Sequence, residues 1–185
     1  MTPAILLPAV MFAALLAWAI LAYNRLVRLR NQVRTAWADV DVQLVRRHDL
    51  VPRLVSAVAA YAGHERAVLE AVTALRARAL EVSDRPRLAG VEDELQDALG
   101  RLVALGEAYP VLKASDNFAR LQHDLVEVEE QLQYARRFFN GAVRDHNDAV
   151  QRFPGLVVAR LAGFPPEDFF EAGPEQRATM KVDLP

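Results

Sequence analysis

The four histidines are the first residues to test as a reaction centre, because helical metal sites are built around histidine. A di-metal site in a helical bundle uses glutamate and histidine three residues apart on facing helices. None of His48, His64, His123 and His146 has a glutamate three positions before it. The chain also lacks cysteine, which excludes disulfides, thiol catalysis and cysteine–zinc sites. We therefore expect no catalytic residue, no metal and no cofactor, with a metal-binding or enzymatic bundle as an alternative.

Charged residues also interrupt the stretch VQLVRRHDLVPRLV, where apolar residues recur at helical spacing. The apolar series keeps a 3.5-residue period on both sides of Pro52, which predicts one continuous helix rather than two. Proline lacks a backbone donor and its ring crowds the carbonyl of His48, so a bend is expected near residues 48–52. The series includes Val33, Trp37, Val40, Leu44, Arg47, Val51, Leu54, Val58 and Tyr61.

Arg47 falls on this core-facing series, whereas Arg46 falls on its flank, because neighbours on a helix differ by about 100°. A buried arginine needs a carboxylate or carbonyl partner, and with such a partner Arg47→Leu is expected to be tolerated. His146 falls on the corresponding series of the last long helix. Two roles remain open for these residues: setting which helices pair, or binding a partner. The candidate residues are Arg46, Arg47, Asp49, Pro52 and His146.

Composition narrows the function classes. The 185 residues carry 22 basic and 24 acidic side chains, a net charge of −2, so no basic field favours nucleic acid. Glycine is scarce and no alternating apolar runs are present, which predicts an all-α protein.

The first 22 residues predict a transmembrane anchor. Ala4 to Ala22 is free of charge, and as a helix it would extend about 28 Å, close to the thickness of the bilayer core. A cleaved signal peptide is less favoured, since no basic residue precedes the apolar run. Four arginines follow it, at 25, 28, 30 and 34. Basic residues stay in the cytoplasm, so we expect a single pass in the cell membrane with the N-terminus outside and the remainder cytoplasmic.

Residues 23–153 predict a helical bundle. Long segments at 24–61 and 115–152 flank short ones at 64–81 and 88–107. This order predicts an antiparallel four-helix-type bundle after the anchor. If the first helix continues through Gly63 to Val82, the chain is instead a long helical hairpin. Residues 154–170 predict a short amphipathic helix that closes the bundle or lies on the membrane, and residues 171–185 a flexible tail.

Several motifs resemble the LemA family in their order along the chain. They are VRRHDLVPRLV, AYPVLKASDNF, RFPG and AGFPPEDFF, within a resemblance that covers Tyr23 to Ala172. The sequence departs from the family pattern at Arg53, Phe139 and His146. The resemblance implies an N-terminal membrane helix, a four-helix-type domain and no enzymatic activity. It also implies membrane protein partners, such as a membrane zinc protease.

Together these patterns predict a scaffold or adaptor that is bound to the lipid bilayer and contacts itself, as a homo-oligomer, or another membrane protein. A third possibility is a filament-forming or membrane-remodelling protein, because a sustained 3.5-residue repeat can also join separate chains.

Overall fold

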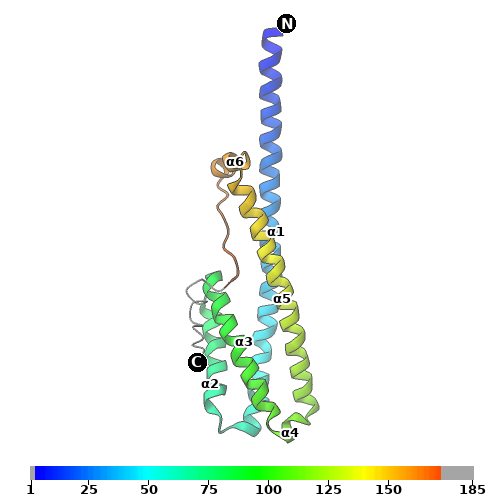
Figure 1. Cartoon of the computed structure of the whole chain (residues 1–185), viewed down its shortest axis with the longest axis vertical. Helices are drawn as coiled ribbons and strands as arrows, with labels where there is room; N and C mark the ends of the chain where they lie inside the picture. The colour runs from blue at the N-terminus through cyan, green and yellow to red at the C-terminus, as the bar shows by residue number, and fades with distance from the viewer. Residues whose placement is uncertain (1–2, 172–185) are drawn as a thin grey trace, which may run out of the picture. The chain divides into compact units, whose positions relative to one another are not determined.

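The computed structural model describes residues 3–171 and confirms an all-α chain, with no strand in that range (Figure 1). The helices are α1 Pro3–Ala62, α2 Arg66–Glu81, α3 Arg85–Glu107, α4 Pro110–Lys113, α5 Asp116–Gln151 and α6 Gly155–Ala162. Apart from Glu171, the tail predicted for residues 171–185 lies outside the described residues.

Helix α1 ends one residue before Gly63, and α2 begins at Arg66. The first helix therefore does not continue to Val82, as the hairpin alternative requires. Glycine favours this break, because it destabilises a helix by about 1 kcal/mol relative to alanine. The next connection is closed by Asp84, whose carboxylate accepts a hydrogen bond from the backbone N–H of Arg87 at 3.1 Å and so caps α3.

The chain divides into two compact units. Unit 1 consists of Met1–Trp37 and Phe138–Glu167, and unit 2 of Ala38–Arg137 and Asp168–Pro185. Helices α1 and α5 each contribute residues to both units, whereas α2, α3 and α4 belong to unit 2 and α6 to unit 1.

The core of unit 2 draws on all five of its helices. Its largest members on α3 to α5 are fully buried leucines and Phe118, and they pack with Val51, Leu54 and Val58 of α1 and with Val72 of α2. The core-facing series predicted from the sequence is buried along most of α1, including Arg47. Trp37 is only partly buried, and Tyr61 is 46% exposed, with Ala62 buried in its place.

The displacement of Tyr61 follows from helix geometry. An α-helix has 3.6 residues per turn, so a strict seven-residue repeat drifts by about 20° per heptad. After four heptads the drift approaches the 100° between neighbouring residues, and the next residue faces the core.

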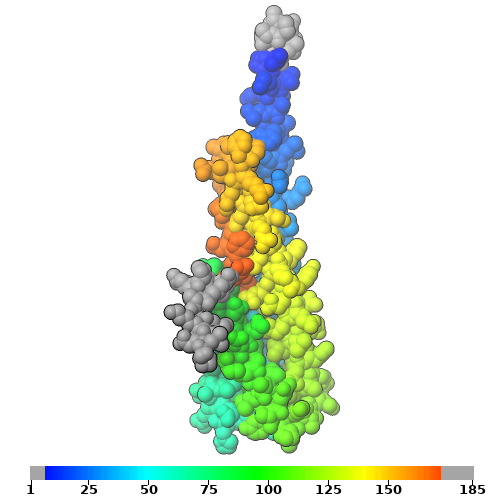
Figure 2. Space-filling model, viewed as in Figure 1, coloured from blue at the N-terminus to red at the C-terminus, as the bar shows by residue number. Residues whose placement is uncertain are grey.

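Unit 1 combines the first part of α1, the end of α5 and α6. Leu26, Val150, Ala159 and Phe164 form its small buried cluster, and Trp37 packs edge-on against Phe139 with ring centroids 5.2 Å apart. The apolar N-terminal part of α1 is exposed and is long and apolar enough to cross a membrane. In Figure 2 the dark-blue residues of this part extend beyond the orange residues of the same unit, without packing neighbours. This is the organisation of a membrane-associated helical protein.

Candidate functional site

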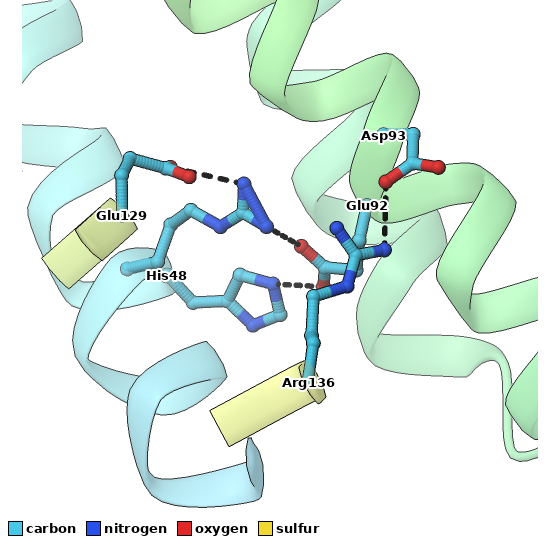
Figure 3. Close-up of polar contacts among 6 residues, drawn as sticks. His48, Glu92, Asp93, Glu129 and Arg136 are labelled. Carbon is cyan, nitrogen blue, oxygen red and sulfur yellow. Dashed lines mark hydrogen bonds and ion pairs between the residues drawn. The ribbon is translucent and has the colours of Figure 1, made fainter. Parts of the chain in front are cut away.

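The most unusual feature of unit 2 is a buried ion network around Arg47. The Arg47 side chain is fully buried, and its guanidinium pairs with the carboxylates of Glu92 and Glu129, which Figure 3 labels. Nη2 is 3.0 Å from Oε2 of Glu92, and Nη1 donates to Oε1 of Glu129 at 3.0 Å. Arg47 thus has the buried carboxylate partner that its position requires, and it has two of them.

His48 is the fourth member of the network. Its Nε2 lies 2.7 Å from Oε1 of Glu92, so both oxygens of this carboxylate are engaged. At the edge of the network, Arg136 donates to Asp93 at 2.7 Å, and its guanidinium stacks on the ring of Phe170. Figure 3 shows the side chains of His48 and Glu92 pointing toward each other from α1 and α3.

The two carboxylates reach the core for different reasons. Glu92 stands four residues after Leu88 and three before Leu95, so helical spacing places it on the leucine face of α3, where it is fully buried. Glu129 follows the buried Val128 on the flank of α5 and keeps 21% of its side chain exposed. Sequence reasoning missed both residues, although a charge inside a leucine ladder is the signal that could have identified Glu92.

The network is not fully satisfied. Nε of Arg47 and Oε2 of Glu129 are buried without a hydrogen-bond partner, and the contact between Nη2 of Arg47 and Glu92 has the distance of an ion pair without hydrogen-bond geometry. Burying such a group costs desolvation free energy, which offsets much of the attraction between its charges.

Burial dominates the titration of Glu129 and raises the pKa of its carboxyl above the usual 4.5. The negative charge of Glu92 acts in the same direction, whereas Arg47 and Arg136 act to lower this pKa. Ionising Glu129 therefore costs more in the folded protein than in the unfolded chain.

This raised pKa sets a direction for the pH dependence of stability. The stabilisation that Glu129 contributes is full below pH 4.5 and is lost as the pH rises through the raised pKa. We expect the free energy of unfolding of the wild type, relative to Glu129→Gln, to fall as the pH rises from 4.5. Urea unfolding at several pH values measures this difference, with Glu130→Gln at the exposed neighbouring position as the control. An increase in the difference with pH would show that pairing with Arg47 outweighs burial.

Pro52 changes the backbone hydrogen bonding of α1 next to this network. Helix α1 continues through it, as the unbroken apolar period predicted. Because proline has no N–H, the carbonyl of His48 lacks its helical donor, and Nε of Arg76 from α2 donates to it at 2.8 Å. Pro52 thereby frees an acceptor on α1 for a side chain of α2.

This contact predicts coupling between Pro52 and Arg76. We expect Arg76→Met to lower the free energy of unfolding by about 1–2 kcal/mol, because it leaves the His48 carbonyl without a partner. In a Pro52→Ala background the new backbone N–H at position 52 can satisfy that carbonyl, and the same substitution is expected to cost less than half as much. A double-mutant cycle by chemical denaturation measures the difference. Equal costs in both backgrounds would mean that the Arg76 contact does not depend on the proline.

The other candidate residues lie outside the network. Arg46 is exposed, with Nη1 3.3 Å from Gln43 and Nη2 3.7 Å from Glu127. Asp49 is also exposed and, with Arg46 and Arg53, lines a small cavity of about 260 Å³. His146 is fully buried in unit 1, where its Nε2 lies 3.0 Å from the carbonyl oxygen of Pro165. The candidate residues therefore do not form one site.

Across residues 3–171, no three His, Asp or Glu side chains gather as a metal site. In the buried network the guanidinium of Arg47 occupies the position between Glu92 and Glu129 where a cation would bind. The arrangement is an ion network in which the central guanidinium is paired with both carboxylates.

Comparison with known proteins finds relatives that are named as magnetosome proteins. The magnetosome protein MamQ 2 of Paramagnetospirillum magneticum is 22% identical over 187 aligned positions, which span 87% of this chain and 69% of the relative. The magnetosome protein MamQ of Magnetospirillum gryphiswaldense shows the same identity and coverage. The model of the LemA family matches residues 36–184, which include the whole ion network and the Pro52 contact. The chain therefore belongs to the LemA family.

Proposed function

We propose that this protein is a single-pass scaffold or adaptor of the cell membrane, with its N-terminus outside and its helical domain in the cytoplasm. The observation that carries the proposal is the continuity of α1. One helix supplies the exposed apolar segment, the arginines that follow it and the core-facing residues of unit 2. Arginines directly after an apolar span favour the cytoplasmic side.

We also propose an antiparallel four-helix arrangement for the domain. Helices α1, α2, α3 and α5 all contribute side chains to the core of unit 2, which supports it. The connections between α1 and α2 and between α2 and α3 are three residues each, as is usual for antiparallel neighbours. In this arrangement Arg47 and Pro52 set which helices pair, whereas the exposed Arg46 and Asp49 can contact a partner.

A binding role agrees with the chemistry of the domain better than catalysis does. Arg47 and Glu92 at the centre of the network are fully buried, and Glu129 keeps 21% of its side chain exposed. The two relatives are named for the magnetosome and not for a reaction. The partner of this chain is proposed to be a second copy of itself or another membrane protein.

The surface best suited to a partner is an apolar groove between α3 and α5. It has a volume of about 930 Å³, and its apolar lining includes Leu99, Gly100, Val103, Leu125 and Val126. Val126 is 56% exposed and contributes to the apolar lining of this groove.

Crosslinking in intact membranes tests the adaptor role. A photoreactive amino acid at position 126 is expected to give a discrete crosslinked product, either a dimer or a heterologous membrane protein. Val42 is the matched control, since it is 55% exposed on α1 and is not part of the groove. If position 126 gives no more product than position 42, the groove does not bind a partner. Stoichiometric metal in the purified protein would favour the metal-binding alternative.

A further inference from the structure

Within the described part of the chain, the two large apolar side chains with the highest exposed fractions lie in and just before α6, and not in the N-terminal span. Leu161 is 85% exposed and Phe153 is 83% exposed, more than Leu21, which at 69% is the most exposed large apolar residue in the described part of the span. Val157 is 46% exposed and lies four residues before Leu161, so both are on one face of α6. Exposed apolar side chains grouped in this way mark a contact surface.

The opposite face of α6 fixes its position in unit 1. Ala159 and Phe164 pack in one cluster with Leu26 of α1 and Val150 of α5. The ring of Phe164 also meets that of Tyr23 at 5.7 Å between centroids. Because Tyr23 directly follows the apolar segment that ends at Ala22, α6 is held beside the end of the proposed span.

Two adjoining cavities place the turn before α6 even closer to the span. One, of about 250 Å³, is lined by Trp18, Leu21 and Ala22 of α1 together with Pro154 and Gly155. The other, of about 490 Å³, shares Arg25, Ala149, Pro154 and Gly155 with the first and adds Asp145, Asp148 and Arg152. Apolar side chains thus give way to charged ones across these cavities, in the order in which acyl chains give way to headgroups in a bilayer.

We propose that residues 152–162 form an interfacial segment that binds the surface of the same bilayer. This proposal rests on the membrane anchoring proposed above. Phe153, Val157 and Leu161 insert at the boundary between acyl chains and headgroups, and the exposed Arg25 contacts lipid phosphates, whereas Arg152 is paired with Asp148 at 3.2 Å. Lipid is favoured as the molecule that covers this segment, because the turn at Pro154 and Gly155 lines the same cavity as Trp18 and Leu21 of the span. An amphipathic helix beside a membrane span meets the interface at this depth.

Because the chain has no cysteine, spin labels can be placed at single sites of the full-length protein. Labels at Phe153→Cys, Val157→Cys and Leu161→Cys are compared in phosphatidylcholine–phosphatidylglycerol vesicles. Collisions with oxygen, which concentrates in lipid, and with a water-soluble nickel complex report the depth of each label. Leu15→Cys in the span and Arg144→Cys, an exposed residue of α5 in the same unit, are the lipid and water controls.

We expect the oxygen-to-nickel collision ratio at positions 153 and 161 to exceed that at position 144 several-fold and to approach that at position 15. If the labels at 153 and 161 match position 144 while position 15 reports lipid, the interfacial segment is overturned and the anchor stands. If position 15 also reports water, the proposed anchoring fails as well. A further outcome would also overturn the proposal: the labels are shielded from both reagents, and they show spin–spin coupling that disappears on dilution with unlabelled protein. That result would mean that a second copy of the chain covers this segment.

Discussion

Replacing Arg47 with alanine is expected to lower the free energy of unfolding by about 3–5 kcal/mol, because a buried ion pair that loses one partner leaves an uncompensated charge. Glu92 would be left fully buried with His48 as its partner, and Glu129 would lose its contact at 3.0 Å. Urea unfolding of the detergent-solubilised full chain, followed by circular dichroism, measures the change. Arg46→Ala is the matched control: this neighbouring arginine is half-exposed, and its ion pair is expected to contribute under about 1 kcal/mol.

The structure changes what is expected of leucine at this position. The sequence favoured Arg47→Leu as a tolerated substitution, but the two carboxylates make it destabilising when it is made alone. Replacing Arg47, Glu92 and Glu129 together with apolar residues of similar volume is expected to recover most of the loss, as buried ion triads can be exchanged for packed apolar groups. If Arg47→Ala costs no more than Arg46→Ala, the network does not contribute to the fold in the way described.

Gly106→Ala is expected to destabilise the protein by about 1–3 kcal/mol, the usual cost of overpacking a filled core. A Cβ at this position would lie 2.3 Å from Cζ of Phe118, whose ring is 1% exposed and packs directly on the glycine. Thermal or urea unfolding of the full chain measures the effect.

Gly100 provides the control within the same helix. A Cβ there would meet nothing within 4 Å, so Gly100→Ala is expected to stabilise α3 by about 0.5–1 kcal/mol. Adding Phe118→Leu to Gly106→Ala is expected to cost less than the two single changes combined, because the smaller side chain relieves the contact. Similar effects of alanine at positions 100 and 106 would contradict the close packing of Phe118.

The sequence predicted the faces of the helices well, because burial follows a period that can be read residue by residue. It placed Arg47 and His146 in the core, and both are fully buried. It did not predict Glu92 as the partner of Arg47, since periodicity identifies the buried face of a helix but not the helix that packs against it. The two residues are far apart along the chain, and only the tertiary fold brings them together.

Local features of the chain explain the other differences between the sequence predictions and the structure. Phe153 stands seven residues after His146 and so continues the core-facing repeat of the last long helix, but α5 ends at Gln151 and the side chain is 83% exposed. A repeat cannot be extended past the end of its helix. At Pro52 the sequence indicated the missing donor, whereas its replacement by the side chain of Arg76 depends on how α2 packs.

The central claim is a single membrane pass with a cytoplasmic domain. Its most direct test is to label two single-cysteine variants with a membrane-impermeant maleimide in right-side-out spheroplasts. Thr2→Cys precedes the apolar segment, and Ser83→Cys lies in the exposed connection between α2 and α3. The wild type, which has no cysteine, supplies the background. Labelling of Thr2→Cys in intact spheroplasts, with Ser83→Cys labelled only after permeabilisation, is the predicted result. Labelling of Ser83→Cys in intact spheroplasts, or protection of both positions, would contradict it.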